Sequence, residues 1–137
     1  MNRLRFDSDS MKLIMFFESM TGAKVKDCII HEKLTFIISE GEMGKAIGKN
    51  GVNIRKVEMK LKKKIKLVEF SNDILQFVKN IIYPIEVFDI NNEDGIVTIF
   101  GKDANSKAML IGRERKNINH VRDIVQRYFD VKEIRVV

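Results

Sequence analysis

Two glycines that lie three positions apart are the feature of this chain with the clearest chemical potential. Gly48 and Gly51 enclose Lys49 and Asn50. Glycine occurs where the backbone must adopt a positive φ or approach a ligand closely, so this spacing indicates a tight turn with exposed amides and a cation at its tip. Backbone N–H groups of such a turn, together with the start of a following helix, can hold a phosphate. The sequence therefore indicates phosphate or nucleic-acid binding.

Two other phosphate-binding motifs do not match this stretch. A nucleotide-binding P-loop has the spacing Gly-x-x-x-x-Gly-Lys-Ser/Thr, but Met43 stands at its first glycine and Asn50 at its hydroxyl residue. The dinucleotide-binding pattern Gly-x-Gly-x-x-Gly fails too, because Gly44, Gly48 and Gly51 have a different spacing. A Gly-x-x-Gly loop between two short helices remains. Loops of this kind clamp about four nucleotides of single-stranded nucleic acid.

Cations dominate the sequence around the loop. Residues 44–66 contain nine Lys or Arg residues and one acid, Glu58. Four cations lie close enough to the loop to follow a sugar–phosphate backbone: Lys45, Lys49, Arg55 and Lys56. The run Lys62-Lys63-Lys64 is equally consistent with a solvated face. The whole chain has a net charge of +6, which favours a polyanionic partner, either nucleic acid or an acidic membrane surface.

The remaining composition narrows the class of protein. A single cysteine, Cys28, excludes an internal disulfide framework, and a hydrophobic content of 45% is sufficient for a packed core. No apolar run reaches the roughly 18–20 residues of a membrane span, and residues 1–9 lack the apolar segment of a signal peptide. His31 and His120 have no metal-ligand spacing around them, and sequence neighbours form no catalytic constellation. We therefore expect a cytoplasmic protein that is not an enzyme and that has no cofactor, metal or membrane partner.

Hydrophobic periodicity and turn residues predict the same order of elements in each half of the chain. The first half is predicted to contain a helix, two strands, two helices separated by the glycine loop, and a strand: 10–21, 25–30, 34–39, 43–47, 52–61 and 65–70, with a short turn at 31–33. The second half is predicted to contain a helix from 74 to just before Pro84, a strand 85–90, a turn 91–95, a strand 96–100, a helix capped by Asp103, a longer helix through 118–128 and a strand 131–137.

The two halves are copies of one pattern. Gly48 and Gly112 differ by 112 − 48 = 64 positions. At this offset five further pairs match: Ile47 with Ile111, Lys49 with Arg113, Asn53 with Asn117, Ile54 with Ile118, and Val57 with Val121. Such a repeat predicts two modules, residues 1–71 and 72–137, each of about 65 residues and near the lower limit for independent stability. Because almost no linker separates them, we expect them to pack together. We expect the four isoleucines to be core residues. An edge of their side chains is expected to form the floor of a groove that holds the bases of the nucleic acid.

The segments Ala46–Ile54 and Leu110–Ile118 resemble the tandem KH repeats of the NusA transcription factors. The resemblance is greatest to the short archaeal form, rests on the paired Ile-Gly-x-x-x-x-Asn-Ile pattern and covers nearly the whole chain. It implies an α+β fold of two tandem type II KH modules, each a small three-stranded sheet with helices packed on one face. It also implies a single-stranded RNA-binding transcription factor that acts in elongation or termination, with RNA polymerase as a partner.

The two loops and their flanking positions form the predicted RNA-binding site. It comprises Lys45, Ile47, Gly48, Lys49, Asn50, Gly51, Asn53, Ile54, Arg55, Gly112, Arg113, Arg115, Lys116 and Asn117. The two asparagines are equally consistent with local caps or turn formers. Two other functions stay open: a KH-type RNA-binding protein in ribosome assembly or RNA chaperoning, and a polymerase-docking interaction module. The sequence does not determine the oligomeric state.

Arg115 departs from the resemblance, because KH loops usually have glycine at this position. A residue with a Cβ is strained at positive φ. We therefore expect either a loop of a different shape, or a loop in which Arg113 and Arg115 replace close backbone approach with charged contacts. In either case we expect the first loop to clamp phosphate better than the second loop does.

Overall fold

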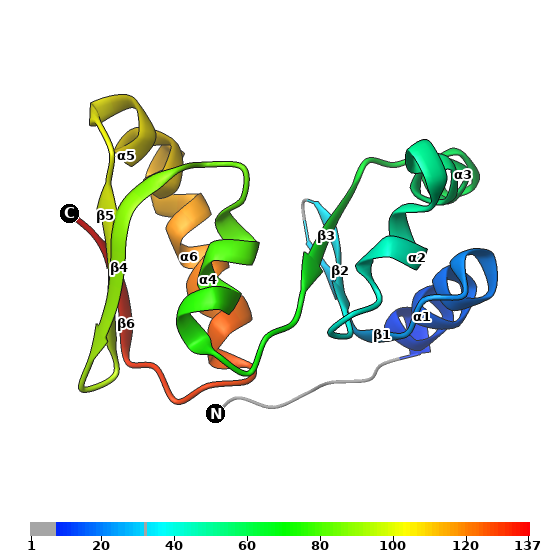
Figure 1. Ribbon diagram of the computed structural model, residues 1–137, viewed down its shortest axis with the longest axis horizontal. Coiled ribbons are helices and arrows are strands. Elements are labelled where there is room, and N and C mark those ends of the chain that lie inside the picture. The colour runs from blue at the N-terminus through cyan, green and yellow to red at the C-terminus, as the bar shows by residue number, and fades with distance from the viewer. Residues whose placement is uncertain (1–7, 32) are drawn as a thin grey trace. The chain divides into compact units, whose positions relative to one another are not determined.

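The computed structural model describes residues 8–31 and 33–137, which form two compact units divided in the sequence between Ser71 and Asn72. Each unit contains helices and one three-stranded sheet, so the fold belongs to the α+β class, as predicted (Figure 1). Glu32, in the middle of the predicted turn at 31–33, and residues 1–7 of the predicted first module lie outside the described residues. None of the described helices is long and apolar enough to span a membrane.

The first unit follows the order helix, strand, strand, helix, loop, helix, strand. Its elements are α1 Ser8–Thr21, β1 Val25–Ile30, β2 Leu34–Ile38, α2 Met43–Ile47, the 3₁₀ turn η1 Lys49–Gly51, α3 Val52–Leu61 and β3 Ile65–Glu69. The sheet order is β1-β2-β3, with β1 and β2 antiparallel and β2 and β3 parallel. Figure 1 shows the three helices of this unit on one side of its sheet. Each of the helices and strands predicted for this half is present.

Alternate residues of β2 explain why the helices pack on that side. Leu34, Phe36 and Ile38 share one face of the strand because side chains alternate along it, and all three are buried in one core with residues of the helices. The ring of Phe17 in α1 packs on Phe36, with the ring centroids 4.4 Å apart. Val57 brings α3 into the same core. This core positions α2 and α3, and therefore the loop between them, against the sheet.

The second unit repeats this order. Its elements are α4 Ile74–Ile82, β4 Val87–Glu93, β5 Ile96–Gly101, α5 Ala104–Ile111, the 3₁₀ turn η2 Arg113–Arg115, α6 Lys116–Gln126 and β6 Glu133–Val136. The sheet order is β4-β5-β6, again with an antiparallel and then a parallel pair. Asp103 caps α5 as predicted, because its Oδ1 accepts a hydrogen bond of 2.7 Å from the backbone N–H of Ser106. The same hydrogen bond lowers the pKa of Asp103.

The hairpin of the second unit is tighter than predicted. The turn lies within the predicted range 91–95, but the predicted start is wrong, because β4 continues to Glu93 and pairs with β5 as far as Ile96. The turn consists of Asp94 and Gly95, with φ values of 53° and 81°. Positive φ at both central residues is the type I′ hairpin geometry, for which Asp-Gly is a preferred sequence. Cross-strand pairing at residues 91–93 therefore outweighs their local turn preference.

The two sheets share one irregularity. Strand pairing shifts between Val25 and Asp27 in the first unit, and between Val87 and Asp89 in the second. Both aspartates accept a hydrogen bond from the backbone N–H of the following residue, at 2.8 Å and 2.9 Å. The two units therefore have the same element order, the same sheet order and a bulge at the same place.

Candidate nucleic-acid interface

The first glycine loop is a sharp turn between α2 and α3. Gly48 ends α2 with φ 78° and ψ 170°, Asn50 has φ 56° and ψ 27°, and Gly51 precedes α3 with φ 76° and ψ 17°. Two backbone hydrogen bonds close the turn, from Gly48 N–H to Gly44 O at 2.9 Å and from Gly51 N–H to Gly48 O at 3.1 Å. The side chains of Lys49 and Asn50 are exposed at its tip. The structure thus has the exposed turn that the glycine spacing predicts.

Asn53 braces this loop from α3. Its Nδ2 donates a hydrogen bond of 2.8 Å to the backbone carbonyl of Lys45 in α2. A Cβ added at Gly48 would lie 2.7 Å from Cγ of Asn53. Both the backbone conformation at position 48 and the close approach of the Asn53 side chain therefore require a glycine. Of the two interpretations of Asn53 that the sequence left open, the structure shows the local structural one; nucleotide contact stays a prediction.

The second loop has the same backbone shape. Gly112 has φ 76° and ψ 168°, Glu114 has φ 55° and ψ 30°, and Arg115 has φ 62° and ψ 21°. The alternative of a differently shaped loop is therefore wrong, because Arg115 adopts the left-handed conformation that Gly51 adopts in the first loop. Such a conformation costs an L-residue about 1–2 kcal/mol. The backbone hydrogen bond from Arg115 N–H to Gly112 O, at 3.1 Å, matches the one that closes the first loop.

Asn117 braces the second loop as Asn53 braces the first. Its Nδ2 donates a hydrogen bond of 2.8 Å to the backbone carbonyl of Met109. A Cβ added at Gly112 would lie 2.6 Å from Cγ of Asn117. In each copy the asparagine therefore packs against the glycine and holds the loop by its hydrogen bond to the preceding helix. This explains why the two residues recur together at the offset of 64 positions. The hydrogen bond of Asn117 helps to keep Arg115 in its left-handed conformation.

The isoleucines of the pattern occupy different environments. Ile118 is buried, at 2% exposure, and Ile54 packs partly buried against the core of its unit. Ile47 is 40% exposed, so its prediction as a core residue is wrong. The helix α2 has only five residues and buries Ala46 alone, which leaves Ile47 at the surface beside the loop. Together with Val52, which is 38% exposed, it provides apolar surface on both sides of the loop.

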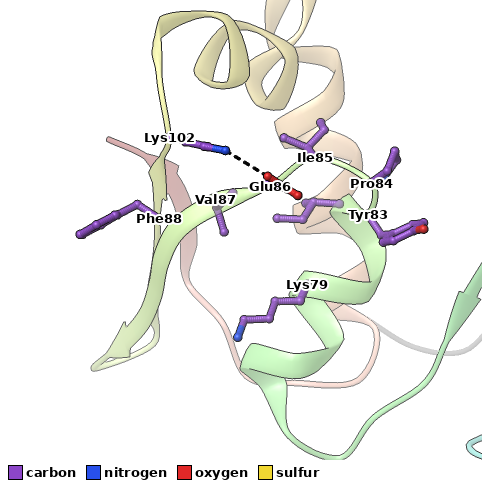
Figure 2. A pocket seen from close by; sticks show the side chains of 9 residues that line it. Lys79, Tyr83, Pro84, Ile85, Glu86, Val87, Phe88 and Lys102 are labelled. Carbon is purple, nitrogen blue, oxygen red and sulfur yellow. Dashed lines mark hydrogen bonds and ion pairs between the residues drawn. The ribbon is translucent and has the colours of Figure 1, made fainter.

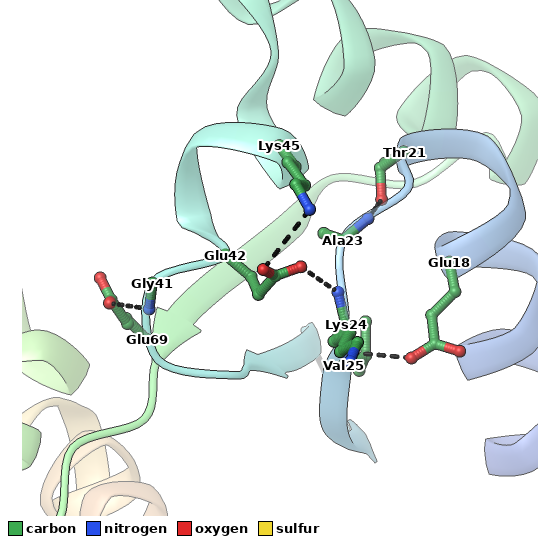
Figure 3. Close-up of polar contacts among 9 residues, drawn as sticks. All are labelled: Glu18, Thr21, Ala23, Lys24, Val25, Gly41, Glu42, Lys45 and Glu69. Atoms are coloured by element: carbon green, nitrogen blue, oxygen red, sulfur yellow. Dashed lines mark hydrogen bonds and ion pairs between the residues drawn. The ribbon is translucent and has the colours of Figure 1, made fainter.

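Three carboxylates of the first unit, among them Glu42 at the start of α2, are held by backbone amides (Figure 3). Glu18, Glu42 and Glu69 accept hydrogen bonds from the N–H groups of Val25, Lys24 and Gly41, at 2.9, 2.9 and 2.8 Å. The hydrogen bond from Lys24 lowers the pKa of Glu42, and the ammonium of Lys45, 3.6 Å from its carboxylate, acts in the same direction. Lys45, a predicted site cation, therefore shares its charge with a carboxylate.

The exposed face of α3 continues the positive surface. Arg55, Lys56 and Lys60 are exposed on this helix, and its one acid, Glu58, accepts a hydrogen bond of 3.0 Å from the backbone N–H of Ile65. The structure thus places cations along the helix that leaves the first loop. In the second unit three exposed cations lie at or directly after the loop, Arg113, Arg115 and Lys116, and other exposed cations lie elsewhere in the unit.

A cavity that the sequence did not predict lies in the second unit (Figure 2). It has a volume of about 670 Å³ and lies between the C-terminal end of α4 and the start of β4. Lys79, Ile82 and Val87 are among its lining residues, and neither glycine loop contributes to it. The only feature of the sequence that marks its position is Pro84, which indicates where α4 ends. Among the described residues, no group of histidine, cysteine and acidic side chains could hold a metal ion.

Replacing Gly48 by Ala should destabilise the protein by about 2–3 kcal/mol, because its backbone region is almost restricted to glycine and the added Cβ would collide with Asn53. Gly51→Ala is the matched control and should cost about 1 kcal/mol, the strain of a left-handed L-residue. At Gly51 the added Cβ would closely approach only the mobile guanidinium of Arg55, at 2.9 Å. Urea denaturation measures both variants, and equal losses of stability would contradict this explanation.

The fold and the braced loop are those of a KH-domain protein, and comparison with known proteins agrees. The KH domain family matches residues 13–88, more than half of the chain. The chain is 40% identical to the "Probable transcription termination protein NusA" of Methanococcus vannielii, over 98% of this chain and 80% of that one. It is 33% identical to the protein of the same name from Thermoplasma acidophilum, over 99% and 97% of the two chains. A crystal structure of APE1850 aligns with a TM-score of 0.74 and 29% identity, covering 96% of this chain and 100% of that one.

The chain therefore belongs to the archaeal NusA-like family of KH-domain proteins. This confirms the resemblance that the paired loop pattern indicated. The family match begins at residue 13 and ends at residue 88, so it includes both loop-forming helices of the first unit and continues into α4 and β4.

Proposed function

We propose that this chain is a single-stranded RNA-binding transcription factor that acts in elongation or termination through two tandem type II KH modules, residues 1–71 and 72–137. The observation that carries the proposal is the pair of loops with matching backbone torsions, each with an exposed tip that carries cations. The relatives named as probable transcription termination proteins support the link to transcription. The proposal involves binding and no catalysis.

In the first module, the loop would hold a phosphate through its backbone amides and Lys49. Anions bind well at such turns because several N–H groups point at one position and the following helix adds a favourable dipole. Ile47 and Val52 would offer apolar surface to the bases, and Arg55 would continue the phosphate track along α3. Asn53 would contribute chiefly by holding the loop in shape, through its hydrogen bond to α2.

In the second module, Arg113, Arg115 and Lys116 would add affinity with less discrimination among sequences. Their charges act on any sugar–phosphate backbone, whereas base edges carry the sequence information. Asn117 would again hold the loop in shape. The two modules would therefore divide the work, with the first as the selective clamp.

RNA polymerase is the protein partner that we propose, within the cytoplasm. Two other roles remain candidates: a KH-type RNA-binding protein in ribosome assembly or RNA chaperoning, and a polymerase-docking module that needs no RNA. Affinity co-purification separates them. Polymerase subunits that are retained only with intact RNA support the proposed function, ribosomal particles support the second role, and polymerase binding that survives nuclease supports the third.

The affinity for single-stranded RNA should fall steeply with salt. For single strands, log K falls with log[salt] by about 0.7 for each neutralised phosphate, so about four to six contacts from both modules predict a slope of roughly −3 to −4. Fluorescence-anisotropy titrations at several salt concentrations measure it. A flat response would show that the positive charge of the chain does not serve nucleic-acid binding.

Arg113→Ala combined with Arg115→Ala tests the contribution of the second loop to that slope. The variant should weaken binding to all RNA sequences about equally and reduce the slope by up to about 1.4, or about 0.7 for each lost phosphate contact. Unequal losses across a panel of RNA sequences would show that these arginines read bases.

A further inference from the structure

The second loop carries an acidic residue where the first loop is neutral. Asn50 and Glu114 occupy equivalent positions, with φ 56° and ψ 27° against φ 55° and ψ 30°, and both side chains are exposed. Because the two loops have one backbone shape, a difference in what they bind must come from their side chains. At the tip, a neutral amide is exchanged for a carboxylate.

The local hydrogen bonds give no reason for a glutamate at this position. Positive φ is uncommon for residues other than glycine, and asparagine is enriched there whereas glutamate is not. Within the part of the chain that the structure describes, the Glu114 side chain forms no hydrogen bond or ion pair. A residue held in a sparsely populated backbone region without a compensating contact points to a functional role.

We propose that Glu114 is a specificity-determining residue that keeps phosphate out of the tip of the second loop. This inference rests on the proposed RNA-binding function. In the first loop, the exposed side chain of Asn50 is neutral, so a phosphate that approaches the tip meets no like charge. In the second loop, the carboxylate of Glu114 repels a phosphate at the same place, while Arg113 and Lys116 on either side still attract the polyanion.

The consequence is a division of binding modes between two loops of identical shape. The second module contacts RNA through its flanking cations and clamps no phosphate between its loop amides. The first module therefore determines which phosphate of the RNA chain is bound between loop amides. The carboxylate of Glu114 contributes to this division without any change of fold.

Glu114→Asn gives the second loop the tip residue of the first and should tighten RNA binding about three- to fivefold. That range follows from removing one like charge at about 4–6 Å from a phosphate in water. If a phosphate then enters the loop, the salt slope should steepen by about 0.7. The reverse variant, Asn50→Glu, should weaken binding by a similar factor.

Asp94→Asn is the matched control. Asp94 is also an exposed acid of the second unit at positive φ, 53°, and its replacement changes the net charge by the same amount. Figure 1 shows its turn, between β4 and β5, at the opposite end of the sheet from α5. Because charges further apart than about 8–10 Å are largely screened at physiological salt, this variant should change the affinity by less than about 1.5-fold.

Anisotropy titrations of the wild type and the three variants with one single-stranded RNA decide the question. Tighter binding by Glu114→Asn than by Asp94→Asn supports the proposal, and equal affinities of these two variants overturn it. A variant that combines Glu114→Asn with Lys49→Asp and Asn50→Asp, compared with the two first-loop changes alone, distinguishes a failure of this inference from a failure of the proposed function. If the first-loop changes alone leave the affinity of the wild type unaltered, the proposed function fails. If they weaken binding but Glu114→Asn restores none of it, only the role of Glu114 fails.

Discussion

Replacing Lys49 and Asn50 together by Asp should weaken binding to single-stranded RNA by about 30- to 150-fold. The two changes alter the charge at the loop tip by three units, and each unit contributes about 0.7–1 kcal/mol at 4–6 Å in water. A phosphate held by the loop amides would then face two carboxylates. Both residues are exposed, and aspartate tolerates the left-handed conformation of Asn50. The fold should therefore remain intact.

Thermal unfolding followed by circular dichroism, together with anisotropy titration, measures this result. The matched control is Asn92→Asp with Lys132→Asp, two exposed positions near the β4–β5 hairpin of the second unit, which changes the net charge by the same three units. The control should weaken binding by less than about threefold, because distant charges are screened. A melting temperature close to wild type with unchanged affinity in the loop variant would exclude the first loop from RNA binding.

Phe36→Ala should destabilise the protein by about 3–5 kcal/mol, the range for removing a buried aromatic side chain from a packed core. Phe36 is fully buried at 0% exposure and packs on the ring of Phe17. The change leaves a cavity beneath the helices that carry the first loop. RNA binding by the first module should therefore be lost as this unit unfolds.

Phe88→Ala is the control for this substitution, because Phe88 is 82% exposed. Exposed substitutions away from special features usually change stability by less than about 0.5 kcal/mol. Urea denaturation followed by circular dichroism compares both variants with the wild type. Similar midpoints for the Phe36 and Phe88 variants would contradict the central position of Phe36 in the core.

Local signals in the sequence predicted most of the elements. The apolar spacing of α1 and α3, the cap at Asp103 and the glycines at positions 48 and 51 all act over a few neighbouring residues. Such signals are readable from sequence because helix capping, periodic burial and positive φ depend on residue type at short range. The repeat at an offset of 64 positions then indicated that the second half follows the same order.

The exposure of Ile47 and the end of β4 were not predictable in this way. Ile47 has the apolar character of a core residue, but the short α2 buries Ala46 fully and Met43 partly and leaves Ile47 exposed. Asn91 and Asn92 have turn-forming side chains, but their pairing with Thr98 and Val97 keeps them in the strand. In both cases contacts between segments override a local preference, and a single sequence does not contain those contacts explicitly.

The sequence by itself determined that the chain carries two glycine-initiated loops in a repeated α+β pattern with a positive charge around them. Only the tertiary structure decided that the second loop keeps the shape of the first, although Arg115 replaces its second glycine. The physical reason lies in two hydrogen bonds, one from a residue outside the turn and one within it. The hydrogen bond from Asn117 to Met109 and the closing bond from Arg115 to Gly112 hold the backbone in place, and together they offset the strain of about 1–2 kcal/mol that one left-handed L-residue introduces.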